Sequence, residues 1–289
     1  MNGILNLNKP AGFTSFDCVA ALRRLTKEKR IGHTGTLDPQ ATGVLPVCIG
    51  KATRLLEFMD DVPKTYLCGC TLGLNTDTLD IWGEIKADRR AEIPDLSAET
   101  VERELLSFLG EITQKPPVFS AIRVNGKRLY EYAREGREVE VPERHVTVHS
   151  IALKSWNGPK EPFTFECVCS RGTYIRSICR DLGELLGTGA CMSSLVRTET
   201  CGYKLADAVS LDALKSMSTE EIEALLDPPE TAVSGLPRLE LNEEQARLFS
   251  AGNPLWSDGT FVPEEPAAAF FGDKLLGVTR GGKIAKVLL

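Results

Sequence analysis

A single carboxylate lies in a loop shaped by glycine and proline, and this loop is the first place where the sequence indicates chemistry. Residues 32–46 contain three glycines and two prolines, which excludes a regular helix or a central strand. Asp38 lies mid-loop, and the apolar Leu37, Val44 and Leu45 can anchor it to a scaffold. Asp-Pro is also a common turn dipeptide. The loop is therefore a candidate site, with an ordinary turn capped by Asp38 as the alternative.

The residues available elsewhere narrow the chemistry of Asp38. No second acid at fixed spacing supports glycoside hydrolysis, although a partner can come from elsewhere in the fold. Three histidines and no serine elbow give little support for acyl transfer, and phosphate-loop and dinucleotide signatures are absent. What remains is a carboxylate acting as nucleophile or base, with a cation to keep it ionised and a ring to hold a planar substrate. Arg176 and Tyr66 are the candidate cation and ring.

Apolar spacing predicts the elements that must position these residues. Around the loop we expect a strand at 3–8, a helix capped by Thr14 or Ser15, a strand at 44–49 and a short helix at 51–59. Further on, the sequence predicts strands at 64–72, 83–87, 146–153 and 163–170, a helix at 96–109 stopped by Gly110, an Asn125-Gly126 hairpin turn, a helix at 129–135 and a strand or turn from 195. A helix capped by Thr173 carries Arg176 and Arg180 on one face.

The C-terminal part is predicted to be a separate small β module. Acidic helices at 205–230 end at Asp227-Pro228-Pro229, a plausible domain boundary. A short helix at 242–251 and small strands at 267–271, 275–279 and 284–288 follow. We therefore expect one domain over 1–230 and another over 231–289.

Composition indicates a globular intracellular protein. The chain has 289 residues with 42% hydrophobic content, no apolar run long enough to span a bilayer and no signal peptide at its start. We therefore expect it in the cytoplasm. Nine cysteines lack the spacing of a zinc site, so buried thiols are expected rather than metal ligands.

Charge is unevenly distributed along the chain. The net charge of -6 argues against a nucleic-acid partner, but residues 205–245 hold ten acids against two basic residues, which leaves the rest slightly basic. A basic patch precedes the Asp38 loop, formed by Arg23, Arg24, Lys27, Lys29 and Arg30. Residues 115–144, with seven Lys or Arg, form a second basic segment. Both permit a phosphate-bearing ligand, although the first patch is equally compatible with a solvated helix face.

Several blocks in order resemble one known family. They are Lys9-Pro10-x-Gly12-x-Thr14-Ser15, Gly32-His33-Thr34-Gly35-Thr36-Leu37-Asp38-Pro39, Lys64-Thr65-Tyr66, Gln114-x-Pro116-Pro117-x-x-Ser120-Ala121, Gly126-x-x-x-Tyr130-x-x-Ala133-Arg134-x-Gly136, Gly172-Thr173-Tyr174-Ile175-Arg176-Ser177 and Leu195-x-Arg197-Thr198. Across residues 3–200 these are similar to the bacterial TruB family of tRNA pseudouridine(55) synthases. Val196 departs from the pattern, since many relatives have a second Arg there.

The resemblance implies an isomerase. Uridine 55 in the T loop of tRNA is flipped out, its N-glycosidic bond is broken, the uracil turns, and C5 is joined to C1′. The implied fold is α+β: a mixed, largely antiparallel sheet flanked by helices, plus a small C-terminal PUA-like β-barrel for the acceptor end of tRNA. Residues 115–144 match the family's thumb. No cofactor or metal is implied, and we expect a monomer that does not bind membranes.

Residue roles follow from the same resemblance. Asp38 is the implied catalytic aspartate, attacking C1′ or the uracil ring or removing the C2′ proton. Arg176 pairs with it and keeps it ionised. Tyr66 stacks on the uracil and His33 fills the vacated space, although a core tyrosine and a turn histidine are the ordinary alternatives. The remaining implied substrate-binding residues are Thr36, Lys64, Arg123, Lys127, Arg134, Tyr174 and Leu195. Tyr174 and Leu195 are implied pocket walls, for which ordinary packing is an equally good explanation.

Two other function classes remain open at this stage. A non-catalytic RNA-binding or tRNA-folding module needs the basic surfaces but not Asp38. A nucleoside hydrolase needs Asp38 but releases free uracil. Mutation of Asp38 separates the first class from an isomerase, and product analysis separates the second.

Overall fold

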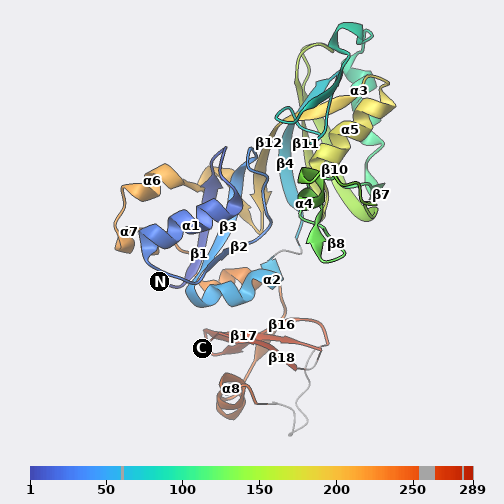
Figure 1. The fold of residues 1–289 in the computed structure, drawn as a ribbon. Helices are drawn as coiled ribbons and strands as arrows, with labels where there is room; N and C mark the ends of the chain where they lie inside the picture. Colours follow the sequence, from blue (N-terminus) through green and yellow to red (C-terminus); the bar gives the residue numbers. More distant parts are fainter. Residues whose placement is uncertain (60–61, 254–263, 282, 289) are drawn as a thin grey trace. The chain divides into compact units, whose positions relative to one another are not determined.

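The chain forms two compact units built from segments far apart in sequence (Figure 1). The computed structural model describes residues 1–59, 62–253, 264–281 and 283–288. The first unit combines Met1–Pro39, Gly43–Asp61 and Cys201–Leu289, and the second combines Gln40–Thr42 and Val62–Thr200.

The first unit contains a mixed sheet buried on both faces. β1 (Gly3–Lys9) pairs antiparallel with β3 (Thr42–Ile49) and parallel with β14 (Val209–Ser210), and β2 (Ile31–His33) pairs with β3. Successive side chains enter different cores: Ile4 belongs to one apolar cluster and Leu5 to another. This two-sided burial explains why both strands are almost continuously apolar. α1 (Ser15–Thr26) covers one face and starts at a capping box in which Thr14 is the N-cap.

The second unit is an antiparallel sheet with helices packed on it. β4 (Lys64–Leu72) lies between β11 (Phe163–Cys169) and β12 (Ala190–Thr200). β10 (Arg144–Ser155) and the edge strand β7 (Gly110–Gln114) continue the sheet beyond β11. α5 (Ile175–Leu185) packs on the sheet, where the sulfur of Cys179 lies 3.5 Å from that of Cys68 on β4.

The remaining elements are short. They are η1 (Gly50–Leu55), α2 (Leu56–Met59), β5 (Leu74–Thr76), β6 (Ile85–Asp88), η2 (Arg90–Glu92), α3 (Ala98–Leu106), β8 (Arg123–Val124), β9 (Lys127–Arg128), α4 (Leu129–Arg134), β13 (Tyr203–Lys204), η3 (Leu205–Asp207), α6 (Leu211–Lys215), α7 (Thr219–Ala224), η4 (Pro229–Val233), β15 (Arg238–Glu240), α8 (Glu243–Ser250), β16 (Ala267–Phe271), β17 (Lys274–Arg280) and β18 (Lys283–Val287).

The α+β class and the largely antiparallel pairing are confirmed, and two local predictions are wrong. Gly110 does not stop a helix: α3 ends at Leu106, and Gly110 opens β7 with φ +96°. Thr173 is not the N-cap of α5. Tyr174 holds that position, and the Thr173 hydroxyl donates instead to the Ser170 carbonyl at 2.9 Å. The hydroxyl is used to close the turn after β11 and is not available to the helix.

The C-terminal strands form an open sheet. Their order is β15-β16-β17-β18, so the described strands do not close into the predicted barrel. Ala268 and Phe270 of β16 share a core cluster with Ile4 and Val44, so within the first unit this sheet packs on the N-terminal strands. In the part of the chain that the structure describes, no helix is long and apolar enough to cross a membrane.

Candidate active site

The loop that carries Asp38 is fixed to the N-terminal segment by a buried lysine. Lys9, at the end of β1, is 0% exposed, and its ammonium donates to the carbonyls of Pro10 and Pro39 at 2.9 Å and to that of Phe13. The Gly12 N–H also donates to the Pro39 carbonyl, at 2.9 Å. Pro39 directly follows Asp38, so two donors hold the backbone next to the half-buried carboxylate.

A second anchor holds the other side of Asp38. The hydroxyl of Ser15 accepts from the Leu37 N–H at 3.0 Å and is 3.3 Å from the Leu37 carbonyl. Ser15 is the first residue of α1 and is buried. The residues immediately before and after Asp38 are thus both tied to the β1–α1 segment, and the carboxylate is presented from a rigid backbone.

Backbone conformation and close packing explain why glycine occupies three positions of this loop. Gly35 and Gly43 have φ of +64° and +102°, where side chains other than glycine are strained. At Gly32 an added Cβ would lie 2.7 Å from Leu56 Cδ1. Of the predicted substrate-binding residues in this unit, His33 ends β2 and is half-buried, and Thr36 is exposed in the loop.

Three predicted residues of the second unit lie on one pair of strands. Tyr66 and Lys64 are on β4 with 8% and 7% exposure, and Leu195 is on β12 opposite Cys68. Arg197 of β12 is directly opposite Tyr66, and residues paired in this way point to the same face of the sheet. Arg197 is fully buried. No role for Arg197 is predictable from sequence, because its register with Tyr66 depends on two strands about 130 residues apart.

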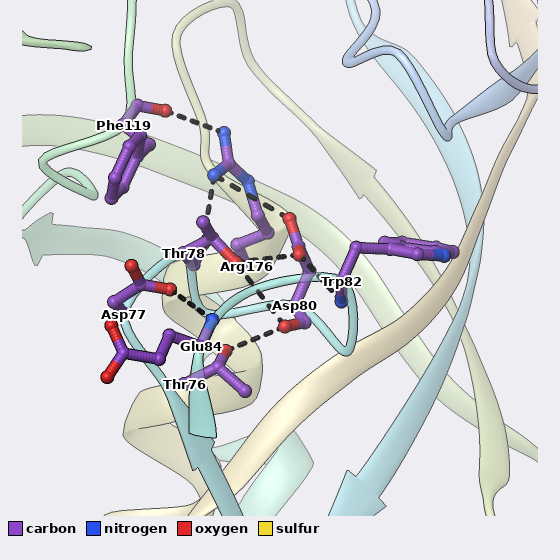
Figure 2. A network of polar contacts seen from close by, with 8 residues as sticks. All are labelled: Thr76, Asp77, Thr78, Asp80, Trp82, Glu84, Phe119 and Arg176. Atoms are coloured by element: carbon purple, nitrogen blue, oxygen red, sulfur yellow. Dashed lines mark hydrogen bonds and ion pairs between the residues drawn. The ribbon is translucent and has the colours of Figure 1, made fainter. Parts of the chain in front are cut away.

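Arg176 occupies the first turn of α5 in a dense polar network (Figure 2). Its guanidinium donates to the carbonyl of Thr78 at 2.9 Å and to that of Phe119 at 3.0 Å. The carboxylate of Asp80 lies 3.9 Å from Nη1, and both side chains are largely buried. The direction of the Arg176 guanidinium is therefore set by the loop after β5 and by the start of the basic segment 115–144.

Asp80 faces Arg176 and has two further hydrogen bonds, a set of contacts that the sequence did not indicate. Its carboxylate accepts from the Thr78 hydroxyl at 2.7 Å and from the Trp82 N–H at 3.2 Å, in addition to facing Arg176. Nothing in the local sequence separates Asp80 from the neighbouring Asp77. Asp80 differs in forming a β-bridge with Met192 of β12, so its position depends on a strand far away in the sequence.

The backbone of Tyr174 is hydrogen-bonded to Gln114, and its ring contacts the basic segment 115–144. The side-chain amide of Gln114 is hydrogen-bonded to both the N–H and the carbonyl of Tyr174, at 3.0 and 3.2 Å. The Tyr174 ring packs against a small apolar cluster formed by Ile122, Leu129 and Val141. The basic segment thus has a core of its own that touches the start of α5.

The predicted basic contacts lie on this segment. Arg123 on β8 is exposed, Lys127 forms an ion pair with Glu135, and the Arg134 guanidinium lies 5.3 Å from the centre of the Tyr130 ring. Asn125 and Gly126 both have positive φ, as the predicted hairpin turn requires.

The cysteines are buried thiols, as predicted. Eight of the nine are buried, Cys201 is half-buried, and no disulfide joins any of them. Burial raises the pKa of the Cys48 and Cys191 thiols to about 12. Among the described residues, no group of His, Cys, Asp and Glu side chains is arranged to hold a metal ion.

Sequence relatives decide the family. A family model described as "TruB family pseudouridylate synthase (N terminal domain)" matches residues 23–175, and a "tRNA pseudouridylate synthase B C-terminal domain" model matches residues 176–234. The "tRNA pseudouridine synthase B" of Streptococcus gordonii is 44% identical over 283 residues, covering 96% of this chain and 95% of the relative. The chain belongs to the TruB family.

A second sequence relative and a solved structure are also similar to this chain. The Geobacillus thermodenitrificans protein of the same name is 45% identical over 257 residues, covering 87% of this chain and 85% of that relative. Among solved structures, a "Cbf5-Nop10-Gar1 Complex" aligns with a TM-score of 0.75 at 24% identity, over 99% of this chain and 85% of the matched chain. At that identity the likeness shows a shared fold, and the TruB assignment rests on the sequence relatives.

Proposed function

We propose that this TruB-family chain is a tRNA pseudouridine synthase that isomerises uridine 55 in the T loop. The observation that carries the proposal is the Asp38 loop, whose backbone is fixed on both sides by Lys9 and Ser15 so that one carboxylate is presented from an anchored position. Family membership over nearly the whole length supports the substrate assignment.

Asp38 is the reactive group in this proposal. The target nucleotide is extruded from the RNA, and the carboxylate attacks C1′ or the uracil ring or removes the C2′ proton. The N1–C1′ bond breaks, the uracil turns in the site, and C5 bonds to C1′. The proton lost from C5 is matched by one that N1 gains, and any bond formed by Asp38 breaks again, so the carboxylate ends unchanged. Because the base never leaves the site, the isomerisation is balanced without a cofactor or a metal.

Residues of the second unit have supporting roles. We assign Arg176 as the cation for Asp38, oriented by Asp80 and by the carbonyls of Thr78 and Phe119. Tyr66 stacks on the uracil and is the candidate acceptor for the C5 proton. His33 fills the position vacated by the flipped base, while Thr36, Lys64, Tyr174 and Leu195 line the pocket.

Binding energy for base flipping is assigned to the basic surfaces. Extruding a nucleotide costs a few kcal/mol of stacking, so phosphate contacts elsewhere must supply it. The segment 115–144, with Arg123, Lys127 and Arg134, is the proposed thumb, and residues 231–289 are the proposed PUA-like domain for the acceptor end. We further propose a monomer in the cytoplasm that forms no membrane contact.

The proposal is tested with Asp38→Asn. On an unmodified T-arm stem-loop this variant is expected to form no pseudouridine while its Kd for the RNA stays within about twofold of wild type, because Asn keeps the shape of the side chain. Appreciable turnover by Asp38→Asn contradicts the assigned chemistry. Free uracil as the product indicates the hydrolase alternative, and RNA binding without any wild-type turnover indicates a binding module.

A further inference from the structure

The loop between β5 and β6 presents a tryptophan to solvent from a tightly fixed backbone. Trp82 is 47% exposed and its neighbour Ile81 is 41% exposed. Among the described residues, no other ring and no cation stacks on the Trp82 indole. An exposed indole held in this way has an apolar face available to a ligand.

Hydrogen bonds hold this loop at several points. The Ile81 N–H donates to the Met192 carbonyl of β12 at 2.9 Å, and the Met192 N–H donates to the Leu79 carbonyl at 3.0 Å. Leu79 adopts a left-handed backbone with φ +64°, and a Cβ on Gly83 would lie 2.2 Å from the Thr78 hydroxyl. A non-glycine residue in a left-handed conformation persists only when its surroundings enforce it. The loop is therefore pre-organised, and so is the start of the Trp82 side chain.

The same carboxylate connects Trp82 with the active-site cation. Asp80 accepts from the Trp82 N–H at 3.2 Å and lies 3.9 Å from Arg176. Figure 2 shows the indole on the side of Asp80 away from Arg176, while Asp77 and Glu84 lie on the opposite side from the indole. The backbone of Trp82 is thus connected to Arg176, the proposed catalytic cation, through Asp80 alone.

Charge indicates which part of an RNA can contact the indole. The cations beside the loop already face acids, Arg176 with Asp80 at 3.9 Å and Lys86 with Glu84 at 2.9 Å, whereas a nucleobase carries no charge and stacks well on tryptophan. Flipping one nucleotide out of an RNA also leaves its neighbours with an exposed face that must be covered.

We propose that Trp82 stacks on a nucleobase adjacent to the extruded uridine. The inference rests on the proposed function, because it requires RNA in this site. The indole takes the place of the lost base stack, and Asp80 holds it in register with Arg176, so that stacking and orientation of the cation are set by one loop. Trp82 contributes to substrate binding and does not react.

The test compares variants of Trp82 that remove the side chain, keep an aromatic ring or keep only apolar bulk. Trp82→Ala is expected to raise KM and Kd for a T-arm stem-loop about 5- to 150-fold, the range for loss of one base-aromatic stack, with kcat within about twofold. Trp82→Phe keeps a ring and is expected to lose less than Trp82→Leu. Leu185→Ala, which removes a 54% exposed side chain from α5, is the matched control and should leave Kd unchanged.

Two further measurements locate the stacked base. With Trp156→Phe and Trp256→Phe, Trp82 is the only tryptophan, and RNA should quench its fluorescence. An abasic site beside the target uridine should weaken wild-type binding but add nothing to Trp82→Ala, because both remove the same stack. Unchanged Kd and KM in Trp82→Ala, or additive losses with the abasic RNA, overturn the inference while wild-type turnover still supports the proposed function. If wild type forms no pseudouridine, it is the proposed function that fails.

Discussion

Lys9 is the residue whose removal should disturb the Asp38 loop most directly. Its ammonium is fully buried and donates to three carbonyls, those of Pro10, Phe13 and Pro39. Lys9→Met keeps a similar side-chain volume but removes all three donors. Hydrogen bonds from a charged group are worth about 1.5–3 kcal/mol each, and the cost of burying the ammonium offsets part of that sum. We expect a loss of about 3 kcal/mol in the free energy of unfolding.

The effect on catalysis should exceed the effect on binding. A shift of about 1 Å in a reacting group can reduce the rate about 100-fold, and the Pro39 carbonyl adjoins Asp38. We therefore expect kcat of Lys9→Met to fall about 100-fold while Kd for RNA changes little, measured by single-turnover pseudouridine formation and by filter binding. Lys160→Met, at an exposed lysine in the β10–β11 turn, is the control. If Lys9→Met retains both the wild-type melting temperature and kcat, the buried ammonium does not hold the loop.

Three further predictions follow from the second unit and the buried thiols. Asp80→Asn removes the charge 3.9 Å from Arg176, and we expect kcat to fall at least tenfold with unchanged RNA affinity; full activity would show that Asp80 does not orient the cation. Gly183→Ala puts a Cβ 2.2 Å from the Ala190 nitrogen, so it should lower the free energy of unfolding by about 1–3 kcal/mol, measured with denaturant, despite the helix preference of alanine. Glu184→Ala, at an exposed position in the same turn, should leave the free energy of unfolding unchanged. Burial raises the pKa of the Cys48 and Cys191 thiols from 9.0 to about 12, so the free energy of unfolding should be level up to about pH 9 and then fall, because the unfolded thiols ionise while the folded ones stay protonated. In Cys191→Ala the free energy of unfolding should fall less steeply with pH. An equal slope in that variant contradicts this origin.

Elements with strong periodicity were predictable from sequence. The strand at 64–72 was expected at the bounds that β4 has, and the helix beginning after Thr14 and the strand at 267–271 were also correct. Each has a local signal, either a capping residue or an apolar run. β7 lacks such a signal, because this edge strand alternates exposed and half-buried residues before Gln114, and its opening Gly110 has the form of a helix stop.

The polar partners of the site were not predictable. Motifs predict Asp38, Tyr66 and Arg176 as site residues. The contact of Asp80 with Arg176 instead depends on the loop docking on Met192, and the contacts of Lys9 depend on three carbonyls converging in the folded chain. Such contacts join residues without any fixed sequence spacing. The approach of Arg176 and Tyr66 to Asp38 stays a prediction.

Positional mapping of pseudouridine tests the central claim most directly. Purified protein is incubated with an unmodified full-length tRNA transcript, with no added metal or cofactor, and every uridine is assayed for conversion. We expect stoichiometric pseudouridine at position 55 alone with wild type and none with Asp38→Asn. Product at another uridine would revise the substrate, and conversion at position 55 by Asp38→Asn would contradict the role assigned to the Asp38 carboxylate.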